Sequence, residues 1–247
     1  MRCGILIIGS LLWDNARREA WRRSRLRVGE KVYVKTAIRY RRRSQSRGDT
    51  FTMTFTPDGP PGQGVLVPCA VTIDDVKGVV TQAEFLWNAE QATASAGSIG
   101  ASWGCVGVLF RDECVRDGWL SEWADFFRSK VSKPIPPVDA DGVLRISWPM
   151  TVADGALADV DVILATATKL DAASSRPQEV ADAWIDQNRC YERYFFENVR
   201  HGIRTPEDGL IWQRIEEREP WWLSNPEYAD PVALLRAELA TTLDAKG

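Results

Sequence analysis

The stretch GILIIGSLLWDN, residues 4–15, constrains the fold more than any other part of this sequence. Residues 4–8 are a continuous apolar run, which is typical of a strand buried on both faces. Gly9 and Ser10 follow at once, so the strand is expected to end in a tight turn. The turn has neither the G-x-G-x-x-G pattern of a dinucleotide-binding loop nor the G-x-x-x-x-G-K-[ST] pattern of a P-loop. Two interpretations stay open: a plain exit from a strand, or a loop whose backbone N–H groups face an anion.

Strand patterns dominate the first part of the chain, and helix patterns dominate the last. The predicted strands after the first cover residues 32–41, 51–56, 64–71, 103–110 and 159–168. The predicted helices run from Asp74 and Asp75 to about 91, over 116–130 and over 176–202, and a further one begins at Thr205. Residues 50–56 alternate threonine with Phe or Met, which predicts a strand buried on one face only.

This grouping predicts an α+β protein with a mostly antiparallel or mixed sheet. We expect a single domain over residues 1–247, with a helical C-terminal extension from about residue 177. The sequence has no apolar run of eighteen residues and no leader pattern at its start, so we expect a cytoplasmic protein without membrane association.

Charge is distributed unevenly along the chain. Residues 1–48 hold fourteen Lys and Arg against three Asp and Glu, although the whole chain has a net charge of -3. A basic segment can attract nucleic acid, but no nucleic-acid-binding motif accompanies it. We therefore expect no nucleic-acid partner, and we interpret most of these arginines as a solvated face paired with acids from the C-terminal half.

Cysteine and histidine usage excludes several kinds of site. The five cysteines are widely spaced and form no C-x-x-C pair, which argues against a disulfide framework or a zinc ribbon. His201 is the only histidine and sits at a predicted helix end, where it suits the helix dipole better than catalysis. A histidine-rich metal site is thereby excluded, whereas a Mg²⁺ site made of carboxylates alone stays open. The pair Trp221-Trp222 is open to interpretation as a lid or an interface.

Glu90 is an acid in an unexpected position. On a helical wheel it falls near the centre of the apolar stripe of the helix predicted from residue 74, a stripe that includes Val79, Ala83 and Leu86. A carboxylate that faces a core is unfavourable unless it is paired or used as a general base. The alternatives are that the helix has frayed at Glu90, or that the acid pairs with an arginine.

Taken together, these patterns resemble those of the γ-glutamylcyclotransferase-like family. Its opening strand and Y-G-S-[LN] loop correspond to Ile8, Gly9, Ser10 and Leu11, and its L-D-x-x-E pattern corresponds to residues 86–90, ending at Glu90. The resemblance covers roughly residues 4–110. Two positions depart from the family: Ile8 replaces an aromatic residue, and Gln91 replaces a glycine. The resemblance implies a mixed, largely antiparallel sheet or small barrel with flanking helices.

The resemblance also implies a reaction without a cofactor or metal. Glu90 would act as general base on the α-ammonium of a γ-glutamyl group, and the freed amine would attack the γ-carbonyl to give 5-oxoproline. The substrate would lie against the backbone at Ile8, Gly9, Ser10 and Leu11. Its carboxylate would meet Arg41, Arg43 or Arg47 together with Ser44, although a solvated basic strand edge is the competing interpretation.

Two other functions stay open. The first is a non-enzymatic pocket that binds a small anionic ligand or a protein partner, because a fold does not fix a function. The second is nucleic-acid binding through the basic segment, which the acidic balance of the whole chain disfavours.

Overall fold

The computed structural model describes most of the chain. The described residues are 1–15, 18–44, 48–57, 59–91, 93–112, 114, 118–153, 157, 159–170, 176–186 and 191–244, with side chains as far as residue 238. Within them no helix is both long enough and apolar enough to cross a membrane.

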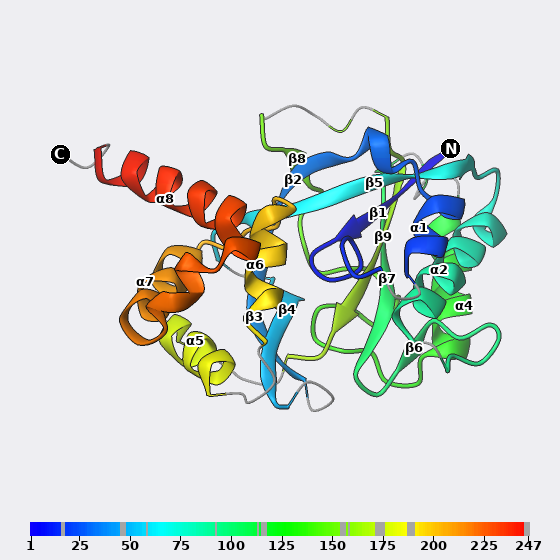
Figure 1. Cartoon of the computed structure of the whole chain (residues 1–247). Coiled ribbons are helices and arrows are strands. Elements are labelled where there is room, and N and C mark those ends of the chain that lie inside the picture. The colour runs from blue at the N-terminus through cyan, green and yellow to red at the C-terminus, as the bar shows by residue number, and fades with distance from the viewer. Residues whose placement is uncertain are drawn as a thin grey trace.

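A seven-stranded sheet forms the centre of the molecule (Figure 1). Its strands, in spatial order, are β6 (Gly100–Ala101), β7 (Gly104–Phe110), β9 (Val162–Thr168), β1 (Arg2–Ile7), β5 (Gly62–Thr72), β2 (Val32–Thr36) and β8 (Met150–Thr151). β1 pairs in parallel with β9, with Ile5 opposite Leu164, and the other described strand pairs are antiparallel. The apolar run of β1 is therefore an inner strand, buried from Cys3 to Ile7.

Helices cover the sheet on one side and form a separate layer beyond a hairpin. They are α1 (Arg18–Arg25), α2 (Val76–Glu90), α4 (Trp119–Lys130), α5 (Pro177–Ile185), α6 (Arg193–Arg200), α7 (Asp208–Arg218) and α8 (Ala229–Asp244), with short 3-10 helices η1 (Val28–Glu30), η3 (Pro220–Ser224) and η4 (Pro226–Tyr228). Helices α1, α2 and α4 lie together against the sheet, whereas α5 to α8 gather beyond the hairpin β3 (Ile38–Ser44)–β4 (Thr50–Phe55) (Figure 1).

The α+β class and the mixed, largely antiparallel sheet are confirmed, but the small barrel is wrong for the described strands. The two edges of the large sheet, β6 and β8, do not pair with each other. The strand expected over residues 32–41 is in fact two strands: the chain leaves the large sheet at Ala37, and β3 pairs with β4 as a separate two-stranded sheet. Both edge strands are only two residues long, which leaves little backbone for closure.

The hairpin is buried on both faces, contrary to the expectation of one-sided burial. All six residues of β4 are buried. On one side Trp184 of α5 donates a hydrogen bond from Nε1 to the Phe51 carbonyl at 3.1 Å. On the other side the hydroxyl of Thr54 donates to the carbonyl of Thr168 on β9 at 2.8 Å. The threonine face of the hairpin therefore faces the large sheet, not solvent.

Helix boundaries follow the capping signals in part. Asp75 caps α2 by accepting a hydrogen bond from the N–H of Gly78 at 2.9 Å, as its position before the apolar stripe predicts. The single helix expected over residues 176–202 is wrong, because α5 ends at Ile185 and α6 begins only at Arg193, after a turn at 191–192. Gly202 follows α6 at φ +74°, a left-handed conformation that favours glycine.

Candidate functional site

A hollow lies where the parallel strands β1 and β9 both end. It is small, with a cavity volume of about 50 Å³. The end of β1 and the turn after it contribute Leu6, Ile8, Gly9, Ser10 and Leu11. The other walls are Arg42 of β3, Thr52 and Met53 of β4, Glu90 of α2, Thr166 and Thr168 of β9, and Tyr194 of α6. Segments from the whole length of the chain thus meet at one place.

The turn after β1 is held by its own carbonyl groups. The carbonyl of Gly9 accepts from Leu12 N–H at 3.0 Å, and that of Ser10 accepts from Asp14 N–H at 2.9 Å. Among the described residues no acceptor is recorded for the N–H groups of Gly9 and Leu11. Gly9 and Leu11 both line the hollow, and backbone N–H groups without a protein acceptor suit an anionic ligand.

Gly9 is needed because a neighbouring side chain leaves no room for a Cβ atom, and not because of its backbone angle. A Cβ atom at this position would lie 2.7 Å from the hydroxyl oxygen of Tyr194, which is closer than van der Waals contact allows. That hydroxyl also accepts a hydrogen bond from the backbone N–H of Met53 at 3.3 Å. Tyr194 therefore joins α6, the hairpin and the turn, and only glycine leaves room for it.

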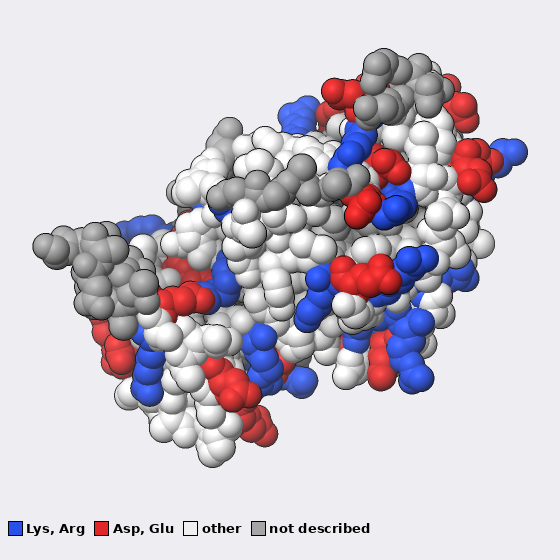
Figure 2. Space-filling model, turned by 90° about the horizontal axis from the view of Figure 1, so that it is seen from above, with Lys and Arg blue, Asp and Glu red and all other residues white. Residues whose placement is uncertain are grey.

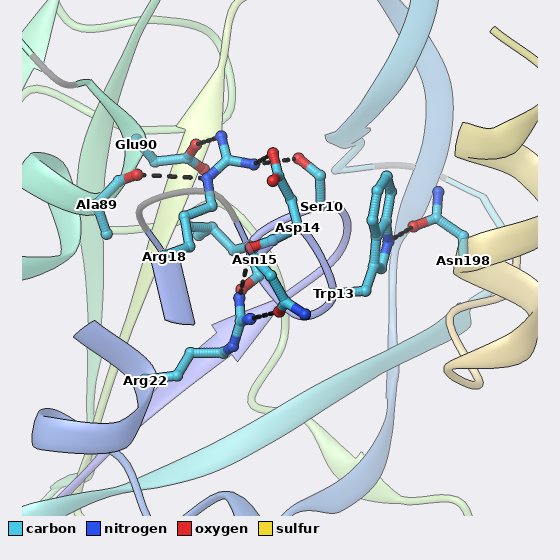
Figure 3. Close-up of polar contacts among 10 residues, drawn as sticks. Ser10, Trp13, Asp14, Asn15, Arg18, Arg22, Ala89, Glu90 and Asn198 are labelled. Atoms are coloured by element: carbon cyan, nitrogen blue, oxygen red, sulfur yellow. Dashed lines mark hydrogen bonds and ion pairs between the residues drawn. The ribbon is translucent and has the colours of Figure 1, made fainter. Parts of the chain in front are cut away.

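Two buried arginines of α1 hold the turn through hydrogen bonds (Figure 3). Arg22 donates to the carbonyls of Leu11 at 2.6 Å and Asp14 at 3.0 Å, and also to the side chain of Asn15. Arg18 donates to the hydroxyl of Ser10 and the carboxylate of Asp14, each at 2.8 Å. Burial lowers the pKa of Arg22 from its ordinary value. These arginines are four residues apart, so they project from one face of the helix.

Glu90 is the last residue of α2 and is paired with Arg18 (Figure 3). The Oε2 atom of Glu90 lies 3.2 Å from Arg18 Nη2, and the two side chains are 18% and 7% exposed. Arg18 also donates from Nε to the carbonyl of Ala89 at 3.3 Å. A helix C-terminus carries partial negative charge, so one guanidinium balances both the helix end and the carboxylate. Of the interpretations open from the sequence, pairing with an arginine is the one observed.

Glu90 and the residues Ile8, Gly9, Ser10 and Leu11 are therefore brought together in one hollow. The basic residues proposed from β3 are not. Arg41, Arg43 and Ser44 do not line it, and Arg47 lies outside the described residues.

The register of the β3–β4 pair explains why Arg42 lines the hollow and Arg41 and Arg43 do not. Arg42 is the cross-strand partner of Thr52, and both line the hollow, whereas Arg43 pairs with Phe51 and lies over its ring at 4.7 Å. A register irregularity between Tyr40 and Arg42 shifts the alternation of β3. A run of three arginines conceals such a shift, because every register places an arginine on each face.

His201, the cysteines and Trp221-Trp222 do not line the hollow in the described part of the chain. His201 ends α6 and its Nδ1 lies 2.9 Å from the carbonyl of Glu197, in the helix-end position expected for it. Cys3, Cys69, Cys105 and Cys114 are buried free thiols, while Cys190 lies outside the described residues. No cluster of three or more His, Cys, Asp or Glu suited to a metal ion occurs among the described residues. Trp222 is buried and Trp221 is exposed.

Sequence reasoning missed Arg18, Arg22, Tyr194 and the two threonines of β9. The spacing of Arg18 to Trp21 and to Arg22 was an available signal, because residues three and four positions apart lie on the same side of a helix. For Tyr194 no local signal existed.

Comparison with known proteins adds nothing to this description: no protein-family model, no curated protein and no solved structure matches the chain.

Proposed function

We propose that this chain is a γ-glutamylcyclotransferase-like enzyme that releases 5-oxoproline from a γ-glutamyl amine or peptide without a cofactor. One observation carries the proposal: Glu90 and the backbone of Gly9, Ser10 and Leu11 line the same hollow although the sequence separates them by some eighty residues. A cyclisation needs a base and oxyanion donors on one substrate, and these residues provide both types of group.

In the proposed reaction Glu90 takes a proton from the α-ammonium group of the substrate. The freed amine nitrogen attacks the γ-carbonyl carbon, a new C–N bond closes the five-membered ring, and the carbonyl oxygen becomes an oxyanion that the N–H groups of Gly9 and Leu11 stabilise. Glu90 passes this first proton to the leaving nitrogen as the bond to that nitrogen breaks. It then removes the second proton from the ring nitrogen and transfers it to the released amine. The products are 5-oxoproline and an ammonium ion, so atoms and charge balance.

Arg18 serves this reaction as a positioning residue. Its hydrogen bonds to Ser10 and Asp14 and its ion pair with Glu90 connect the turn to the end of α2, so one guanidinium sets the distance between the donors and the base. A cytoplasmic location and a small-molecule partner, with no nucleic acid, belong to the same proposal.

The test is a screen of γ-glutamyl amines and dipeptides for 5-oxoproline release, followed by Glu90→Gln. Glutamine keeps the size of the side chain but removes the proton acceptor, so turnover is expected to fall about 10²-fold or more. Glu84→Gln is the matched control, because Glu84 lies half-buried on the same helix but does not line the hollow. Full turnover in Glu90→Gln would contradict the role of Glu90.

The alternative is a non-enzymatic pocket that binds a small anionic ligand or a protein partner. The ion pair between Glu90 and Arg18 favours it, because this acid already has a structural partner. If no γ-glutamyl compound releases 5-oxoproline, the non-enzymatic pocket becomes the favoured function.

A further inference from the structure

Two hydroxyl groups in the wall of the hollow have no hydrogen-bond partner among the described residues. The Oγ1 atoms of Thr166 and Thr168 are buried, and neither finds a donor or acceptor among the described residues. The two residues are 7% and 8% exposed. Buried polar atoms nearly always have a partner, so each exception calls for an explanation such as a ligand or a water.

Their position favours a ligand. Thr166 and Thr168 are two residues apart on β9, so their side chains project from the same face of the strand, and both line the hollow that contains Glu90. Valine has the same shape and suits a buried strand, but it could not donate a hydrogen bond. The two neighbouring hydroxyls of β9 could each donate a hydrogen bond to one of a pair of ligand oxygens.

A positively charged side chain on the neighbouring hairpin indicates that these ligand oxygens belong to an anion. Arg42 lines the same hollow, and its guanidinium lies over the ring of Trp103 at 4.6 Å. Trp103 in turn stacks on Trp87 of α2, with ring centroids 4.9 Å apart. A guanidinium and two hydroxyl donors form a set that suits a carboxylate, since charge-assisted hydrogen bonds favour an anionic acceptor.

We propose that Thr166, Thr168 and Arg42 form a carboxylate subsite, and that together with Glu90 they select the zwitterionic head of an α-amino acid. The carboxylate lies against the hydroxyls and Arg42, and the ammonium group lies against Glu90. The identity of the ammonium partner rests on the proposed function, but the carboxylate subsite stands on the unpartnered hydroxyls.

The test uses three small probes that cannot cyclise: L-2-aminopentanoate, pentanoate, which lacks the ammonium group, and butylamine, which lacks the carboxylate. Binding to the full chain is measured by ligand-observed NMR. We expect L-2-aminopentanoate to bind about tenfold or more tightly than either of the other two, because each loses one charge-assisted contact. Pentanoate or butylamine binding as tightly as L-2-aminopentanoate would overturn the selection of a zwitterion, as would no binding of any probe.

The double variant Thr166→Val/Thr168→Val isolates the hydroxyls. It is expected to bind L-2-aminopentanoate about tenfold more weakly while its binding of butylamine is unchanged, since only the carboxylate loses its donors. Thr166→Ser/Thr168→Ser, which keeps both hydroxyls, is expected to restore binding even if the valine variant folds poorly. Thr36→Val is the matched control. Thr36 of β2 has a buried hydroxyl with no partner in the described part of the chain, and it lies outside the hollow.

The outcomes separate this inference from the proposed function. Unchanged binding of L-2-aminopentanoate by the valine double variant would mean that water alone occupies the hydroxyls, and it would overturn the subsite even if 5-oxoproline is released. The expected binding pattern without any 5-oxoproline release would uphold the subsite and refute the cyclisation.

Discussion

Arg18 is the residue on which the geometry of the site depends most. Its guanidinium contacts Ser10, Asp14, Ala89 and Glu90, and its side chain is 7% exposed. The acids that it pairs with are more exposed than it is. The arrangement is asymmetric: several groups share one cation, so the loss of the cation affects all of them, whereas the loss of one acid leaves the cation with other partners.

This asymmetry predicts different costs for two substitutions. Arg18→Met is expected to lower the free energy of unfolding by about 2–4 kcal/mol, because it removes a buried cation that two acids share. Glu90→Gln is expected to change it by less than about 1 kcal/mol, because Arg18 keeps Asp14 and Ser10. Urea denaturation measures both, with exposed Arg23→Met as the control on the same helix. A large loss of stability in Glu90→Gln would instead mark the pair as mainly structural.

At the scale of elements, α5 and α7 are joined by a cluster of charges. Asp182 of α5 accepts hydrogen bonds on Oδ1 from Arg214 at 2.7 Å and from Arg218 at 2.9 Å, both on α7. The hydrogen bond from Arg214 contributes most to holding the pKa of Asp182 below its ordinary value, and Arg218 adds to it against the opposing effect of desolvation. The helical layer that carries Tyr194 thus includes an acid-sensitive connection.

The sign of this effect predicts a pH dependence. Because the pKa of Asp182 is lower in the folded than in the unfolded state, its stabilisation is present above the unfolded value of about 3.9 and is lost as the pH falls through the folded value. The difference in unfolding free energy between the wild type and Asp182→Asn is therefore expected to be constant near neutral pH and to shrink below about pH 4. Glu179→Gln, on the same helix and paired with nearby Arg176, is the control. A difference that does not vary with pH would contradict the assignment.

For the whole molecule, part of the positive charge of residues 1–48 is paired with acids or buried. Arg2 pairs with Asp159, Arg39 pairs with Glu207, and Arg18 and Arg22 are buried against the turn. On the face shown in Figure 2, positive and negative side chains are interspersed. The expected pairing with C-terminal acids is observed for Arg2 and Arg39, but Arg39 is buried and is not part of a solvated face. Arg18 and Arg22 are also buried.

This distribution predicts weak electrostatic attraction to nucleic acid. Random double-stranded DNA is expected to show no detectable binding at physiological salt, because non-specific binding requires many simultaneous phosphate contacts. A gel shift at increasing salt concentration measures it, with a known DNA-binding protein as the positive control. A robust shift at physiological salt, weakening steeply as salt is raised, would revive the nucleic-acid hypothesis.

The sequence by itself determined the features that depend on neighbours along the chain. The apolar run of β1 predicted an inner strand, Asp75 predicted the start of α2, and the grouping of strands and helices predicted the α+β class. Each follows from local periodicity or capping, in which a residue and its cause lie within a few positions. The same reasoning identified Glu90 as a carboxylate out of place on an apolar helix face.

Only the tertiary structure decided what Glu90 faces and which residues share its hollow. Arg18, Thr166 and Tyr194 reach the site from α1, β9 and α6, and no local pattern ties these elements together. The break at Ala37 and the register of Arg42 depend on which strand each segment pairs with, and pairing is a contact between distant segments. Local patterns select the type of each element, but long-range packing selects its partners, and the site is made of those partners.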